Sequence, residues 1–137
     1  MFQSVLVPVG FTERDLEAVD LATRFVSPDG EVTLVHVIQT VPGIDLDGDP
    51  DFYGRLESAA SAKMSAMGER LEGTGVAWSA VLVVGHRYEE IVRLAEDGYD
   101  LLVVSSHRVD LDDPRAGAAT MSYRLAVGSP CAVLLLK

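Results

Sequence analysis

Short apolar runs alternate with longer amphipathic segments throughout this chain, and this alternation limits the possible folds more than any other feature. Five runs are near-continuously apolar, namely Ser4–Val9, Val32–Ile38, Ala77–Val84, Leu101–Ser105 and Cys131–Leu136. Such runs are typical of parallel strands that are covered on both faces. A length of 137 residues fits one compact core. We therefore expect a single α/β domain that spans residues 1–137.

The four segments between the runs have the periodicity of helices. The first begins at the favourable N-cap Thr12, and its expected buried face is Leu16, Val19, Ala22 and Val26. The second covers residues 51–72, with an expected buried face of Phe52, Leu56, Ala60, Met64, Met67 and Leu71. Phe25 is also expected in the core. A third helix runs from about Tyr88 to Glu96 and a fourth over residues 119–128. Because such crossovers are right-handed, we expect a mostly parallel five-stranded sheet with helices on both faces.

The charge of the chain restricts its partners and its location. The formal net charge is −10, which repels nucleic-acid phosphates and anionic membranes. We therefore expect no nucleic acid and no membrane as a partner. Nine Arg, only two Lys and many carboxylates are consistent with a salt-rich cytoplasm. The single cysteine, Cys131, cannot form an internal disulfide and is expected to be a buried apolar residue. The chain has no leader-like or membrane-spanning pattern, so we expect a cytoplasmic protein.

Neither catalysis nor metal binding is indicated by the polar motifs. His36 is expected to bond to backbone inside a strand, His86 to lie at the start of the third helix, and His107 to lie near a ligand cleft. Ser106, His107 and Asp110 are too close in sequence for a catalytic triad, and no G-x-S-x-G motif is present. The segment "DLDGDPD" offers Asp45, Asp47, Asp49 and Asp51, but Pro50 and Leu56 occupy positions where a calcium loop needs Gly and Glu. A solvated loop that ends in an N-cap at Asp49 or Asp51 is favoured.

Several segments in order resemble the universal stress protein family. These are "VLVPVGFTERDLEAVDLA", "VTLVHVI", "YEEIVRLAEDGYDLLVVSSH" and "SPCAVLLLK", and the resemblance covers essentially the whole chain. It implies a flavodoxin-like, Rossmann-like sheet with strand order 3-2-1-4-5. It also implies a homodimer in which the last strands, residues 131–137, pair.

The resemblance also implies the position of a nucleotide cleft. Some members bind ATP through the motif G-x-x-G, nine residues, G-[ST], in which glycines let backbone amides approach phosphates. Here Ser105 and Arg108 replace the first two glycines and, after a spacer with one extra residue, Ala119 replaces the third, so only Thr120 matches. The nucleotide-binding members also carry an Asp where this chain has Gly10. The implied cleft comprises Pro8, Val9, Gly10, Val37, Ser105, Arg108, Ala119 and Thr120.

Two functions remain open. The first is a non-enzymatic, dimeric stress-response or regulatory module that binds a protein partner or small ligand, with no cofactor required. The altered motif favours it, as do Asp110, Asp112 and Asp113, whose charge opposes a triphosphate. The second is an ATP-binding switch or slow ATPase that uses loop 105–120, where Arg108 and Arg115 offer positive charge. Surface pairs between these arginines and the neighbouring aspartates are the simpler expectation.

Overall fold

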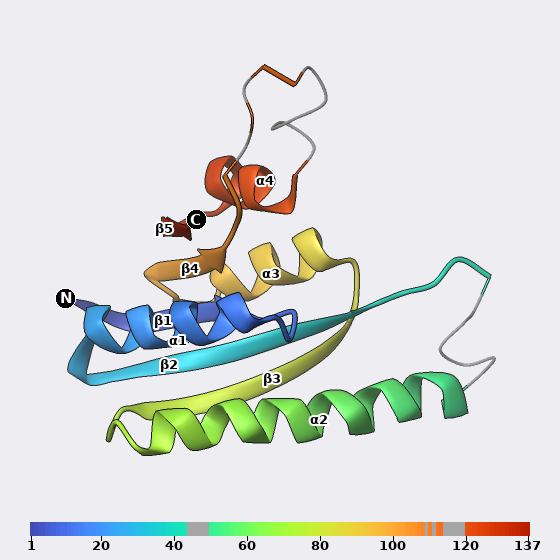
Figure 1. Ribbon diagram of the computed structural model, residues 1–137, viewed down its shortest axis with the longest axis horizontal. Coiled ribbons are helices and arrows are strands. Elements are labelled where there is room, and N and C mark those ends of the chain that lie inside the picture. Colours follow the sequence, from blue (N-terminus) through green and yellow to red (C-terminus); the bar gives the residue numbers. More distant parts are fainter. Residues whose placement is uncertain (44–49, 109, 111, 114–119) are drawn as a thin grey trace.

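The computed structural model describes the whole chain except residues 44–49, 109, 111 and 114–119. Strands and helices alternate along the chain (Figure 1). The strands are β1 (Phe2–Pro8), β2 (Val26–Gln39), β3 (Ala77–Gly85), β4 (Leu101–Ser105) and β5 (Ala132–Leu136). The helices are α1 (Glu13–Phe25), α2 (Pro50–Glu72), α3 (Arg87–Ala95) and α4 (Met121–Gly128). The strands form one parallel sheet in the order β3-β2-β1-β4-β5, which confirms the expected fold.

Alternate side chains of the central strand β1 divide the core between the two faces of the sheet. Val5 and Val7 pack with buried residues of α1 and α2, including Val19 and Met64. Leu6, which lies between them, packs on the opposite face with buried residues of α3 and α4, namely Ile91, Ala95 and Leu125. This alternation is the period of two that a strand imposes on its side chains. Helices therefore cover both faces of the sheet, as the sequence predicts.

Three apolar side chains that were expected in the core are partly exposed instead. Leu16, Phe25 and Leu56 retain 37%, 37% and 38% of their accessible surface. In α2 the buried position near the start of the helix is Tyr53, which packs with Ile38 and Ala60. In α1, Asp15 and Ala18 are buried in place of Leu16. The expected helical stripes therefore had the correct period but were rotated by about one residue at these positions.

The second strand begins earlier than predicted, directly after α1. Val26, which was expected on the helix, is already extended and pairs with Phe2 of β1. Gly30 lies so close to the backbone of Gln3 that an added Cβ would be 2.6 Å from the Gln3 carbonyl oxygen. Residues 26–31 therefore belong to β2, although the Pro, Asp and Gly residues among them are typical of a turn.

A close contact between Trp78 of β3 and Gly68 of α2 fixes the long helix against the edge of the sheet. A Cβ added at Gly68 would overlap the six-membered ring of Trp78. The indole Nε1 donates a hydrogen bond to Glu72 Oε1 at 2.8 Å, one turn further along α2. Gly54, near the other end of the same helix, is exposed and has open space around its Cα.

We expect Gly68→Ala and Gly54→Ala to change stability in opposite directions. The added methyl at position 68 forces the Trp78 ring or the helix to move, which lowers the free energy of unfolding by about 1–3 kcal/mol. The same substitution at position 54 removes a helix-disfavouring glycine and raises it by up to about 1 kcal/mol. Urea denaturation of the two variants measures both changes. Equal effects would contradict the close packing described for Trp78.

Candidate functional site

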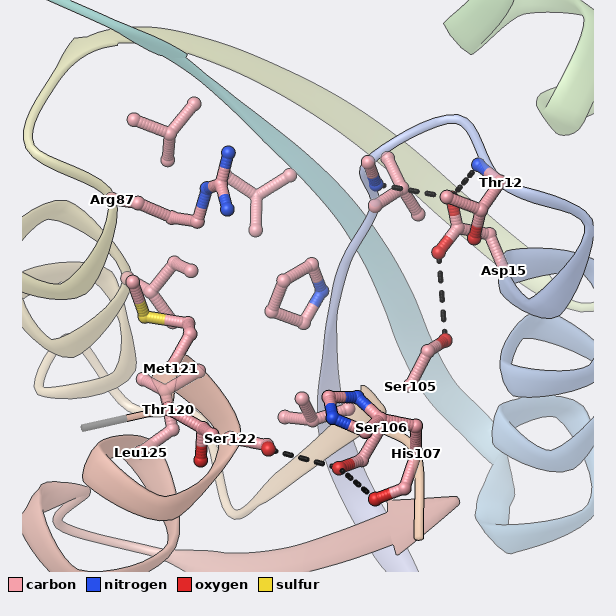
Figure 2. A pocket seen from close by; sticks show the side chains of 17 residues that line it. Thr12, Asp15, Arg87, Ser105, Ser106, His107, Thr120, Met121, Ser122 and Leu125 are labelled. Carbon is pink, nitrogen blue, oxygen red and sulfur yellow. Dashed lines mark hydrogen bonds between the residues drawn. The ribbon is translucent and has the colours of Figure 1, made fainter. Parts of the chain in front are cut away.

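A cavity of about 360 Å³ opens at the carboxyl ends of β1 and β4, between the starts of α1, α3 and α4 (Figure 2). Its volume lies in the range usual for small-molecule sites. In parallel sheets ligands bind at this edge, where neighbouring strands lead to opposite faces. The lining consists of Pro8, Val9, Gly10, Thr12, Asp15, Val35, Val37, Arg87, Ile91, Val104, Ser105, Ser106, His107, Thr120, Met121, Ser122 and Leu125.

Six of the eight cleft residues suggested by the resemblance line this cavity. They are Pro8, Val9, Gly10, Val37, Ser105 and Thr120. Arg108 is exposed and is not part of the lining. Within the described part of the chain Arg108 forms no ion pair, so its expected pairing with Asp110, Asp112 or Asp113 is not found. Ala119 and Arg115 lie outside the described residues.

The acidic segment that precedes α2 is only partly described. Asp45, Asp47 and Asp49 lie outside the described residues, so the N-cap expected at Asp49 stays a prediction. Asp51 lies within the first turn of α2, after Pro50, and is therefore not the N-cap. Within the described residues, no group of three His, Cys, Asp or Glu side chains is arranged to hold a metal ion.

One wall of the cavity is organised by the buried carboxylate of Asp15 in the first turn of α1. Only 3% of this residue is accessible. Its Oδ2 accepts hydrogen bonds from the backbone amides of Gly10 (3.0 Å) and Thr12 (2.9 Å), and Ser105 Oγ donates to its Oδ1 at 3.5 Å (Figure 2). The carboxylate thus satisfies two amides at the helix N-terminus, where the dipole also favours negative charge. It ties the loop after β1 to the end of β4.

The loop between β1 and α1 also contains a backbone conformation that is rare for a residue with a side chain. Phe11 has φ 65°, in the left-handed region that favours glycine. Its ring stacks on His36 with 4.2 Å between ring centroids, and Lys63 Nζ lies 5.2 Å from the Phe11 centroid. His36 Nδ1 lies 2.8 Å from the carbonyl oxygen of Val9, which confirms the expected contact of this histidine with backbone. These contacts stabilise the strained residue beside Gly10.

The opposite wall is formed by the end of β4 and the start of α4. Thr120 is the N-cap of α4, and its hydroxyl accepts a hydrogen bond from the Tyr123 amide at 3.2 Å. Ser106 is buried, and its Oγ lies 2.9 Å from Ser122 Oγ. Its other contact is with the carbonyl oxygen of His107, not with the imidazole ring. The described residues therefore do not form the Ser-His-acid arrangement that hydrolysis by a serine nucleophile needs.

Asp15 and Arg87 are two charged lining residues that the sequence prediction did not include. Thr12 followed three residues later by Asp15 resembles a capping box, which is the signal that could have identified Asp15. Arg87 directly follows Gly85-His86 at the end of a predicted strand, where a sheet of this kind binds ligands. His86 precedes α3 as its N-cap, and His107 lines the cavity, as expected.

Cys131 lies outside this site and has the character of an apolar residue. It is half-buried and packs against the cluster formed by α3, α4 and the sheet. Burial, with a further contribution from the charge of Asp100, raises the pKa of its thiol. The thiol form therefore predominates at neutral pH, which is typical of an unreactive cysteine. Among the described helices, none has both the length and the apolar character of a membrane span.

We expect Asp15→Ala to lower the free energy of unfolding by about 1–3 kcal/mol, because the part-buried hydrogen bonds from the Gly10 and Thr12 amides lose their acceptor. Asp15→Asn keeps one acceptor oxygen and is expected to cost less. Asp20→Asn is the matched control on the same helix, because Asp20 and its partner Arg70 each leave 47% of the side chain exposed. Such an exposed pair contributes at most about 1 kcal/mol. A loss at Asp15 no larger than at Asp20, in thermal or urea unfolding, would contradict the role given to Asp15.

Comparison with known proteins agrees with this architecture. A sequence model of the universal stress protein family matches residues 1–137. Universal stress protein MJ0577 of Methanocaldococcus jannaschii is 27% identical over 157 aligned residues, which include 100% of this chain and 97% of that protein. The solved structure of MJ0577 is similar with a TM-score of 0.82 and 27% identity, and covers 100% of this chain and 96% of that one.

Two more distant structures share the fold and contain nucleotides. One is a universal stress protein in complex with cAMP, with 22% identity, a TM-score of 0.73 and coverage of 99% of this chain and 97% of that one. The other is a universal stress protein family protein from Arabidopsis thaliana with AMP bound, with 17% identity, a TM-score of 0.70 and coverage of 98% and 91%. Because the family model matches the full length, this chain belongs to the universal stress protein family.

Proposed function

We propose that this protein is a non-enzymatic, dimeric stress-response or regulatory module that binds a small ligand in the cavity between β1 and β4 and binds ATP only weakly. The observation that carries this proposal is the cavity itself, whose lining combines apolar side chains with polar ones. Relatives with cAMP or AMP bound support a nucleotide-class ligand. The acidic charge argues against nucleic acid and membranes as partners, and the single cysteine suits a cytoplasmic location.

The first argument for weak ATP binding concerns Gly10, in the part of the cavity that would hold the nucleoside. Gly10 supplies no carboxylate where the nucleotide-binding relatives are expected to carry Asp. Asp15 does not replace it, because its Oδ2 already accepts two backbone hydrogen bonds from Gly10 and Thr12. A charge-assisted hydrogen bond of this type contributes about 1.5–3 kcal/mol, or roughly one to two decades of affinity.

The phosphate side of the cavity supports the same conclusion. Ser105 and Arg108 each carry a Cβ where close approach of backbone to phosphate favours glycine. Further along this loop, Asp110, Asp112 and Asp113 lie in succession, and the Asp112 amide donates to Asp110 Oδ1 at 3.0 Å. These carboxylates oppose the charge of a triphosphate.

An ATP-binding switch or slow ATPase is the second candidate. The position of Thr120 favours it, since this residue begins α4 at the edge of the cavity, where a helix N-terminus attracts anions. The two candidates differ in the affinity for ATP that they require. A switch needs binding at cellular nucleotide concentrations, whereas the regulatory module does not.

Calorimetry with Mg-ATP separates the candidates. We expect no dissociation constant tighter than about 1 mM, which corresponds to about 4 kcal/mol. Combining Gly10→Asp, Ser105→Gly, Arg108→Gly and Ala119→Gly should strengthen ATP binding. A Cβ at Gly10 has no heavy atom within 4 Å, so a side chain can be added at this position without a clash at its first carbon. Micromolar binding of ATP by the unmodified protein would favour the switch and contradict the regulatory module as proposed.

The dimer is proposed from the position of β5. This strand lies at the edge of the sheet, where it pairs with β4 and leaves its other backbone edge available for a second strand. Its residues from Val133 to Leu136 are only partly buried. On the adjacent helix α4, Tyr123 and Val127 expose 47% and 69% of their surface. A two-fold contact between two β5 strands would cover this apolar area.

Light scattering is expected to report twice the chain mass of 14.7 kDa. Leu135→Lys should weaken the dimer, because a charge would enter the two-fold contact. Leu135 also packs against the core of its own chain, so circular dichroism must first establish that the variant is folded. Val127→Lys, at a more exposed position of α4, provides a second variant with less effect on the core. A monomer at both physiological and high salt would refute the proposed contact.

A further inference from the structure

Arg87 is the first residue of α3, and its side chain reaches into the cavity rather than along the helix. Figure 2 shows its guanidinium group pointing into the space between the α3–α4 wall and the loop that holds Thr12 and Asp15. The backbone amide of Arg87 donates to Gln39 Oε1 at 3.3 Å, which fixes the start of the helix beside the end of β2. The side chain is therefore presented to the cavity from a defined backbone position.

Nothing in the described part of the chain neutralises this guanidinium group. Its side chain forms neither a hydrogen bond nor an ion pair with the described residues. The nearby carboxylates of α3 face other cations, because Glu90 pairs with Arg93 and Glu89 Oε1 lies 3.9 Å from Arg124. Asp15, across the cavity, already accepts two backbone amides. Toward the described residues, the side-chain donors of Arg87 are therefore not used and can serve a ligand.

The position of Arg87 does not favour stability of the protein itself. A positive charge in the first turn of a helix opposes the helix dipole. Arg87 is exposed, forms no ion pair with the described residues and points into a cavity, an arrangement that suits ligand binding better than folding. Its planar fork of N–H groups matches the oxygens of a phosphate in a bidentate arrangement.

The rest of the cavity defines the remainder of the ligand. Its interior is formed by buried apolar side chains, among them Val35, Val37, Ile91, Val104 and Leu125. Such an interior suits an apolar or aromatic ring system. The hydroxyl groups of Thr12, Ser105 and Ser122 around it can exchange hydrogen bonds with a polar ligand.

We propose that Arg87 anchors the anionic group of the ligand and selects an organic phosphate with a single phosphate group, such as a nucleoside monophosphate. This inference rests on the proposed ligand-binding function and specifies its chemistry. One guanidinium group can bind two oxygens of one phosphate, whereas the aspartates of loop 105–120 oppose additional phosphates. The anion is thereby held from the start of α3 rather than by the altered glycine motif.

Calorimetric titration with AMP and with adenosine tests the anchor. We expect AMP to bind more tightly than adenosine, and Arg87→Gln to weaken AMP binding by about tenfold or more while leaving adenosine binding unchanged. Arg87→Lys keeps the charge without the fork and should retain part of the affinity. Arg93→Gln is the matched control on the same helix, because its side chain is 67% exposed, pairs with Glu90 and does not line the cavity.

The possible outcomes separate this inference from the function on which it rests. If AMP and adenosine bind equally, or if Arg87→Gln and Arg93→Gln behave alike, the anchor is refuted and ligand binding stands. A parallel loss of adenosine binding in Arg87→Gln would also refute it, because the arginine would then contact the base. If neither compound binds the unmodified protein, both the ligand class and the anchor are wrong. Melting temperatures of the variants, expected near that of the unmodified protein, exclude unfolding as the cause.

Discussion

The burial of β1 at the centre of the sheet is the constraint on which the rest of the structure depends. Val5, Leu6 and Val7 are fully buried, with alternate side chains in the two core clusters. A strand with apolar side chains on both faces requires helices on both sides and a neighbour on each edge, here β2 and β4. Because the chain leaves β1 and β4 toward opposite faces, a cavity opens at their carboxyl ends. The position of the site thus follows from the burial of β1 between core clusters on both faces of the sheet.

The walls of this cavity combine features that are structural with features that we assign to binding. The Asp15 carboxylate is occupied by backbone amides and holds the loop after β1 in place. Phe11 in the same loop adopts a left-handed conformation that its stacking on His36 supports. On the opposite wall, Arg87 has no partner among the described residues. Among the described residues, the Asp15 carboxylate that accepts backbone hydrogen bonds therefore faces an arginine without a partner, which favours an anionic ligand.

The sequence predicted the fold well because its main determinants are local. The apolar runs and helical periods identified each element, and the resemblance supplied the strand order, which the structure confirms. Periodicity identified most buried positions of α1 and α2, but it also assigned Leu16 and Leu56 to the core although the structure exposes them. The role of Arg87 depends on segments that are distant in sequence, and Asp15 adds one such contact to its local bonds with Gly10 and Thr12. Ser105, for example, donates to Asp15 across 90 positions.

Six cleft residues could be named from the sequence because the family resemblance fixed their place at the ends of strands. Arg108 lies outside the cavity lining, since a residue in a loop can point away from the site that its sequence position suggests. Arg87 was missed because an arginine at the start of an amphipathic helix is usually a solvated residue, and only its direction in space distinguishes it.

Mass spectrometry of the small molecules released from the purified protein tests the central claim most directly, because it examines the cavity without prior choice of a ligand. The account predicts that ATP is not present in a stoichiometric amount and that any retained organic phosphate carries a single phosphate group. Recovery of ATP at about one molecule per chain would contradict it, since binding weaker than about 1 mM does not survive purification.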